Sequence, residues 1–175
     1  LPDLIEKSQP DEELKFWVSG CATGEEVYSL AIIIDEALSK SSLKPKVKIF
    51  ATDINIDALE KAILGVYPLT IANDITPERL EKYFTLEQDS FQVKRKLQKM
   101  LLFGHHNLSK DAVFTRINLI VYRNILMSMQ PELQHKTLLN LHFYPRKEEI
   151  LFLGNVENIN FLADEFISIN SKYNF

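Results

Sequence analysis

Three short features of the sequence carry side chains that could bind a small molecule. Residues 19–24 read SGCATG, and two adjacent carboxylates, Glu25 and Glu26, follow directly. Farther along, Asp53 ends a stretch rich in β-branched and aromatic residues. Small loop residues let the backbone approach a ligand closely. The paired glutamates would repel a phosphate and could bind a cationic amino group instead.

The loop that contains Gly20 differs from the common phosphate-binding loops. It lacks the G-x-G-x-x-G dinucleotide fingerprint, and no lysine follows its second glycine as a P-loop requires. Asp53 stands where acids of nucleotide-binding α/β folds accept hydrogen bonds from ribose hydroxyls. An adenosine that carries an amino acid has both a ribose for Asp53 and an amino group for the paired glutamates. The sequence therefore predicts a site for S-adenosylmethionine.

The elements that must position these residues alternate between strand and helix patterns. Residues 16–18 form an apolar run too short for a helix, and the segment after Gly24 has helical spacing. Further strands are expected over 46–52, 117–122 and 150–153, and further helices over 54–64, from 77 onward and over 131–142. Such alternation predicts an α/β fold, a mainly parallel sheet with helices on both faces. Ligands of such sheets bind at the carboxyl ends of the strands.

Residues 85–104 interrupt the alternation. Polar residues 87–90 separate short apolar segments, which predicts a small hairpin-like β insertion before a third core strand near residues 100–103. The 175 residues, 46% hydrophobic with 5 glycines, fit a single domain. The chain starts at Leu1 without methionine and reaches its first strand by about residue 15, so we expect a fragment of a longer protein.

Composition excludes several classes of partner and compartment. A net charge of -4 argues against nucleic acid, and the basic run at 94–99 is too short to change that. One cysteine precludes an internal disulfide framework. No apolar run approaches the roughly 20 residues of a membrane helix. We expect a cytoplasmic protein without membrane insertion.

Several motifs, in order and spacing from about Lys15 to the C-terminus, resemble those of the CheR-type chemotaxis receptor methyltransferases. They are SGCATGEEVYSLA, FATDINIDALEKAILGVYP, HHNL, INLIVYRNIL, PELQ and LFLGNVENI. The resemblance implies the Rossmann-like fold of S-adenosylmethionine-dependent methyltransferases. It also implies methyl transfer from S-adenosylmethionine to receptor glutamates, with S-adenosylhomocysteine as product. The implied partner is a chemoreceptor cytoplasmic domain or another signalling protein, and fused methylesterase, sensory or kinase domains occur in related proteins.

The resemblance also assigns residues to the site. Cofactor contacts fall on Gly20, Glu25, Glu26, Asp53, Asn107, Leu108, Arg123 and Asn124. Asn107 and Leu108 would lie near the adenine, and Arg123 and Asn124 beside the methionyl part. Arg123 is also the candidate catalytic residue, together with Ser128 at the position of the family tyrosine. No metal is expected.

The sequence departs from the family pattern in four places. Tyr122 replaces a cysteine, Ser128 stands where a tyrosine is expected, and residues 145–149 replace a glycine-containing turn. The family's N-terminal helical domain is not in this chain. Two functions therefore stay open: a protein-glutamate O-methyltransferase, and a catalytically reduced S-adenosylmethionine-binding or sensory module of a hybrid signalling protein.

Some of these residues also have ordinary structural interpretations. Without its context Asp53 would be a helix cap, and of the two glutamates we expect one to be solvated and the other to face the pocket. Cys21 is expected to be a small loop residue, because no histidine or acid supports it as a nucleophile. The pair His105-His106 lacks the ligand set of a metal site.

Overall fold

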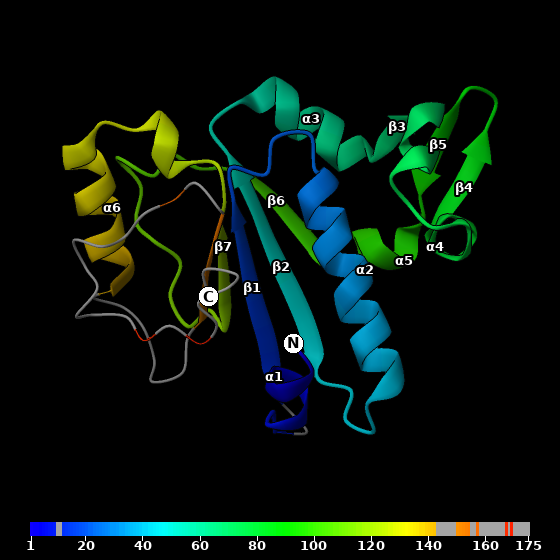
Figure 1. Cartoon of the computed structure of the whole chain (residues 1–175), viewed down its shortest axis with the longest axis horizontal. Coiled ribbons are helices and arrows are strands. Elements are labelled where there is room, and N and C mark those ends of the chain that lie inside the picture. The colour runs from blue at the N-terminus through cyan, green and yellow to red at the C-terminus, as the bar shows by residue number, and fades with distance from the viewer. Residues whose placement is uncertain (10–11, 143–149, 155–156, 158–166, 168, 170–175) are drawn as a thin grey trace.

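A five-stranded parallel sheet forms the centre of the molecule (Figure 1). The computed structural model describes residues 1–9, 12–142, 150–154, 157, 167 and 169. The strand order is β6-β2-β1-β7-β8, with bounds Leu101–His105, Lys46–Asp53, Glu13–Ser19, Leu119–Tyr122 and Ile150–Leu153. Every neighbouring pair in this sheet is parallel, so the predicted sheet is confirmed.

Each face of the sheet has its own apolar core. Along β1, Phe16 and Val18 belong to one core, whereas Trp17 belongs to the other, as the two-residue period of a strand requires. Buried residues of α1 (Pro2–Glu6), α2 (Glu25–Lys40), α3 (Ile56–Leu64) and α5 (Arg95–Gln98) join the first core. Leu138 of α6 (Pro131–His142) joins the second. Helices therefore cover both faces, as predicted.

Local signals set the helix ends. Helix α2 begins at Glu25, after Gly24 at φ 94°. Helix α3 begins two residues later than expected, because the Asn55 side chain accepts a hydrogen bond from the backbone N–H of Ala58 and so caps it. It ends at Leu64, and the left-handed φ of 60° at its C-cap Gly65 matches the predicted cap.

Residues 66–93 form a small subdomain beside α3. It contains β3 (Val66–Pro68), the short helix η1 (Leu69–Asn73), α4 (Pro77–Tyr83), β4 (Phe84–Glu87) and β5 (Ser90–Val93). The strands make an antiparallel sheet in the order β3-β5-β4. The β4-β5 hairpin overlaps residues 85–104, where an insertion was expected, and begins one residue earlier. Strand β3 was not expected, because three residues carry no periodic signal.

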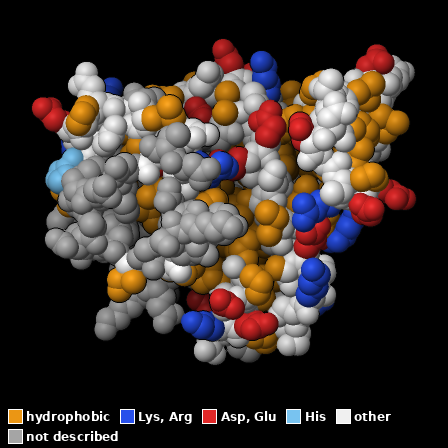
Figure 2. All heavy atoms as spheres, viewed as in Figure 1, with side chains coloured by type: hydrophobic (Ala, Val, Ile, Leu, Met, Phe, Trp, Pro, Cys, Tyr) orange, Lys and Arg blue, Asp and Glu red, His pale blue; other side chains and the backbone are white. Residues whose placement is uncertain are grey.

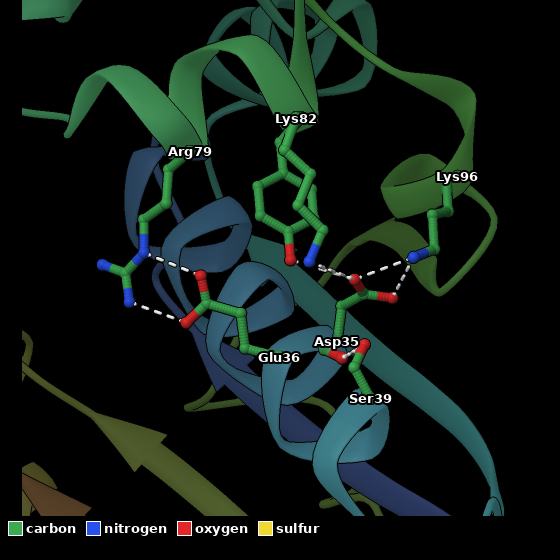
Figure 3. Close-up of polar contacts among 7 residues, drawn as sticks. Asp35, Glu36, Ser39, Arg79, Lys82 and Lys96 are labelled. Atoms are coloured by element: carbon green, nitrogen blue, oxygen red, sulfur yellow. Dashed lines mark hydrogen bonds and ion pairs between the residues drawn. The ribbon is translucent and has the colours of Figure 1, made fainter.

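Charged contacts join the small subdomain and α5 to α2 (Figure 3). The buried Asp35 accepts hydrogen bonds from the Tyr83 hydroxyl at 2.9 Å and from Lys96 Nζ at 2.8 Å. One helical position on, Glu36 accepts two bonds from Arg79, at 2.8 and 2.7 Å. Burial raises the pKa of Asp35, but the bonds from Lys96 and Tyr83 and the nearby lysine charges outweigh it, so the pKa is lowered.

The surface between α2 and the small subdomain is hollowed and mainly apolar (Figure 2). Its apolar and aromatic lining consists of Tyr28, Ile32, Ile33, Tyr67, Ile71, Ile75 and Phe84. Glu25, at the first turn of α2, lies at this hollow as well as beside the loop that contains Gly20. The small subdomain therefore borders the region where the sequence places its ligand.

Candidate functional site

Four segments predicted to bind the ligand follow four adjacent strands at one edge of the sheet. Residues 20–24 follow β1, Asp53 ends β2, Asn107 and Leu108 follow β6, and Arg123 and Asn124 follow β7. Because the strands are parallel, these carboxyl ends lie along the same edge (Figure 1). The structure therefore brings the four segments together.

Two glycines shape the loop between β1 and α2. Gly20 has φ 63°, and a Cβ there would lie 2.8 Å from the Ile125 side chain. Gly24 has φ 94°, and a Cβ there would lie 2.9 Å from Ala62 Cβ. A larger residue at either position would meet both strain and a close contact. The loop therefore packs closely against Ile125 and Ala62, which leaves no room for larger residues at these two positions.

Asp53 ties this loop to the end of β2. Its Oδ2 accepts a hydrogen bond from the Ala22 backbone N–H, and its Oδ1 accepts one from that of Asn55, both at 2.8 Å. It is not the N-cap of α3, which is Asn55. Each carboxylate oxygen can accept more than one hydrogen bond, so both oxygens keep capacity for ribose hydroxyls.

The two glutamates at the start of α2 have different surroundings. Glu25 is exposed and accepts a hydrogen bond from the Thr23 hydroxyl, at 2.6 Å to its closer oxygen. Glu26 is partly buried, and its Oε1 accepts a hydrogen bond from Arg123 Nη1 at 2.5 Å. Glu26 therefore connects α2 to the loop after β7. This division agrees with the expectation that only one of the pair is solvated.

The segment after β6 has a well-defined turn. Asn107 Oδ1 accepts hydrogen bonds from the backbone N–H and the hydroxyl of Ser109, at 3.0 and 2.6 Å. The ring of His106 is buried against Trp17, and its Nε2 lies 3.0 Å from the carbonyl oxygen of Ala112. His106 is thus a structural residue that holds the segment on the sheet.

The segment after β7 adopts an uncommon backbone conformation. Asn124 has φ 59°, in the left-handed region that asparagine tolerates better than most residues. Ser128 lies in the short helix η2 (Leu126–Ser128), which begins two residues after Asn124. The altered turn at residues 145–149 lies outside the described residues. The structure thus brings Arg123 and Asn124 to the site.

Cys21 is buried in the same loop. Burial, with the negative charges of Asp53 and Glu25, raises the pKa of its thiol to about 12. The thiol stays protonated at neutral pH and is a poor nucleophile. This agrees with the structural role expected for Cys21.

Two residues that support the site were missed by the sequence analysis. The Tyr67 hydroxyl, from β3, donates a hydrogen bond to the carbonyl oxygen of Thr23 at 2.9 Å. Glu157 accepts a hydrogen bond from the backbone N–H of Ile125 at 3.1 Å. Glu157 lies in the motif LFLGNVENI, and its place in that motif could have marked it as a candidate site residue. Nothing local in the sequence marks Tyr67.

The side chains at this edge suit the chemistry of S-adenosylmethionine. Arg123 can bind a carboxylate, and Glu26 or the Asn124 amide can bind an ammonium group. Asp53 can accept from ribose hydroxyls, and Leu108 offers an apolar contact for the adenine. Within the part of the chain that the structure describes, no group of histidine, cysteine and acidic residues could hold a metal ion.

Comparison with known proteins identifies the fold of the chain and its family. The fold is that of the S-adenosylmethionine-dependent methyltransferases, as in DszA carbon methyltransferase, with a TM-score of 0.50, 15% identity and coverage of 93% of this chain and 34% of that chain. Residues 1–175 match the family model described as CheR methyltransferase, SAM binding domain. The chain therefore belongs to the CheR methyltransferase family, whose cofactor is S-adenosylmethionine.

Sequence relatives agree with this assignment. The chain is 33% identical over 164 residues to a chemotaxis protein methyltransferase of Borreliella burgdorferi, covering 91% of this chain and 58% of that protein. It is 34% identical over 170 residues to an uncharacterized 104.1 kDa protein of Rhodobacter capsulatus, covering 97% of this chain and 18% of that protein. The chain thus spans less than two thirds of these relatives. No helix among its described residues is long and apolar enough to cross a membrane.

Proposed function

We propose that this chain is the catalytic domain of a protein-glutamate O-methyltransferase that modifies chemoreceptor cytoplasmic domains. The observation that carries the proposal is the meeting of Glu26, Asp53 and Arg123 at one edge of the sheet, in a chain of the CheR family. These groups can accept from the ribose and bind both charges of an amino acid. The relatives named chemotaxis protein methyltransferase support the choice of substrate.

The reaction needs alignment more than proton transfer. The bound cofactor supplies a methyl group on a positively charged sulfur. An ionised glutamate of the acceptor would attack that methyl carbon as the carbon–sulfur bond breaks, which would give a γ-glutamyl methyl ester and S-adenosylhomocysteine. Because the acceptor carboxylate is already deprotonated at neutral pH, no general base is required.

The residues of this chain would act by positioning. Asp53 and the loop it holds would fix the ribose, and Arg123, held by Glu26, would fix the amino-acid end. Correct placement of the reacting atoms can supply several kcal/mol of the barrier reduction. This accounts for how a domain with Ser128 in place of a tyrosine could still transfer the methyl group.

The test is methylation of a chemoreceptor cytoplasmic domain with S-adenosylmethionine labelled in its methyl group. We expect label in the receptor that is released as methanol by mild base, which identifies an ester. A receptor with its acceptor glutamates changed to glutamine is the matched control. Binding of S-adenosylhomocysteine by the full-length protein without any transfer to the receptor would refute the enzyme and support a binding module.

A further inference from the structure

Glu157 is a buried acid behind the loop that follows β7. The residue is only 7% exposed, and its Oε1 accepts a hydrogen bond from the backbone N–H of Ile125. Ile125 in turn packs against Gly20, where a Cβ would lie 2.8 Å from its side chain. Glu157 therefore supports two of the segments that form the candidate site.

The second carboxylate oxygen of Glu157 needs a donor. Oε2 is buried and has no hydrogen-bond partner among the described residues. A buried acceptor without a partner is unfavourable, so such groups have a functional or structural reason. Gly154 makes room for this oxygen, because a Cβ at that position would lie 2.3 Å from it.

The side chain of Asn124 reaches the same place. The point where a Cβ of Gly154 would lie is 3.4 Å from Asn124 Oδ1 and 2.3 Å from Glu157 Oε2. Two acceptor oxygens thus lie within 3.4 Å of one point. A half-turn of the Asn124 amide about its last torsion exchanges Oδ1 for Nδ2, which is a donor.

We propose that Glu157 is a positioning residue that sets the orientation of the Asn124 amide in the cofactor complex. Oε2 of Glu157 accepts a hydrogen bond from Asn124 Nδ2, and Asn124 Oδ1 then faces the α-ammonium group of the methionyl part. The inference rests on the proposed function, because it takes S-adenosylmethionine as the ligand. It adds a specificity: the site recognises the amino group of the ligand through an acceptor whose direction Glu157 determines.

Glutamine at position 157 tests this orientation. The Ile125 N–H requires an acceptor, so the glutamine carbonyl oxygen stays there and its NH₂ group takes the place of Oε2. That NH₂ group donates to Asn124 Oδ1, and Asn124 Nδ2 then faces the ammonium group of the ligand. Glu157→Gln is therefore expected to weaken ligands that carry the α-amino group and to spare those that lack it.

The measurement is calorimetric titration of the full-length protein with S-adenosylhomocysteine and with its analogue lacking the α-amino group. Glu157→Gln should lower the affinity for S-adenosylhomocysteine about tenfold or more, as for a lost hydrogen bond to a charged group. Affinity for the deaminated analogue should change less than about twofold, which is much less than the loss of one such bond would cause. Glu60→Gln, an exposed acid on α3, is the matched control and should change neither affinity.

A second variant keeps the test decisive if Glu157→Gln does not fold. Asn124→Gly retains the left-handed backbone and removes the amide, so it should lose affinity for S-adenosylhomocysteine selectively. Where Glu157→Gln does fold, adding it to Asn124→Gly should have no further selective effect. Equal loss for both ligands, unchanged affinity in both variants, or additive selective losses would overturn the inference while leaving the proposed function intact. Failure of the wild-type protein to bind S-adenosylhomocysteine would overturn the proposed function, and the inference with it.

Discussion

Replacing Asp35 by asparagine removes one charge from the contact between α2, α4 and α5 and keeps the shape of the side chain (Figure 3). The buried Tyr83 hydroxyl donates to Asp35 Oδ2 at 2.9 Å in the wild type, and the asparagine oxygen can still accept this hydrogen bond. The other oxygen, Oδ1, becomes an NH₂ group, so its ion pair with Lys96 Nζ at 2.6 Å is lost. We expect the variant to fold with a lower free energy of unfolding.

The structure sets the size of this loss. A hydrogen bond to a charged group contributes about 1.5–3 kcal/mol. The Lys96 side chain is 61% exposed and regains water when the bond breaks, so we expect a loss of about 1–2 kcal/mol for Asp35→Asn. Asp35→Ala also leaves the Tyr83 hydroxyl without an acceptor, which adds about 1–3 kcal/mol.

The effect of Asp35 depends on pH with a definite sign. Its pKa is lowered in the folded state from the ordinary value of 3.8, so the folded state favours the ionised form. The stabilisation is therefore present above pH 3.8 and is lost as the pH falls through the folded pKa. The difference between the wild type and Asp35→Asn should be full at neutral pH and shrink only below that value.

Urea unfolding followed by fluorescence at several pH values from 7 to 3 checks this prediction. Glu36→Gln is the matched control, because it removes the neighbouring contact with the partly exposed Arg79 and should cost only about 0–1 kcal/mol. Equal stability of Asp35→Asn and the wild type at neutral pH would refute the reasoning. So would a stability difference that grows as the pH falls below 3.8.

Three further predictions concern the candidate site. Asp53→Asn should lower the affinity for S-adenosylhomocysteine about tenfold or more, because the charged acceptor proposed for the ribose hydroxyls is replaced by a neutral amide; unchanged calorimetric affinity would limit Asp53 to its structural bonds with Ala22 and Asn55. Gly24→Ala should destabilise the fold by about 2 kcal/mol in urea unfolding, whereas Gly104→Ala, with nothing within 4 Å of its Cβ, should not; equal effects would contradict the contact argument. A longer chain with a helical domain placed before residue 1 should gain more cofactor affinity and methyl transfer than Ser128→Tyr gives in residues 1–175, because a covered site excludes water; rescue by Ser128→Tyr alone would reverse that ranking.

Much of the fold could be predicted because its signals are local. The limits of β2, the start of α2 and the cap at Gly65 follow from residue type and short-range periodicity. Strand β3 could not be predicted in this way. Its three residues become a strand only because β5 supplies hydrogen-bond partners, and that pairing joins residues 66–68 to residues 90–92.

For the candidate site, the sequence by itself determined the residue types and the strands that they follow. The small loop, Glu26, Asp53 and Arg123 could be selected because carboxyl ends of parallel strands share one edge of a sheet. Tertiary structure decided which of these groups contact one another: Glu26 pairs with Arg123, Asp53 holds Ala22, and Glu157 supports Ile125. These contacts join residues 97, 31 and 32 positions apart, and no local propensity encodes such distances. Only the order of the strands, fixed by packing on both faces of the sheet, brings those residues within hydrogen-bonding distance.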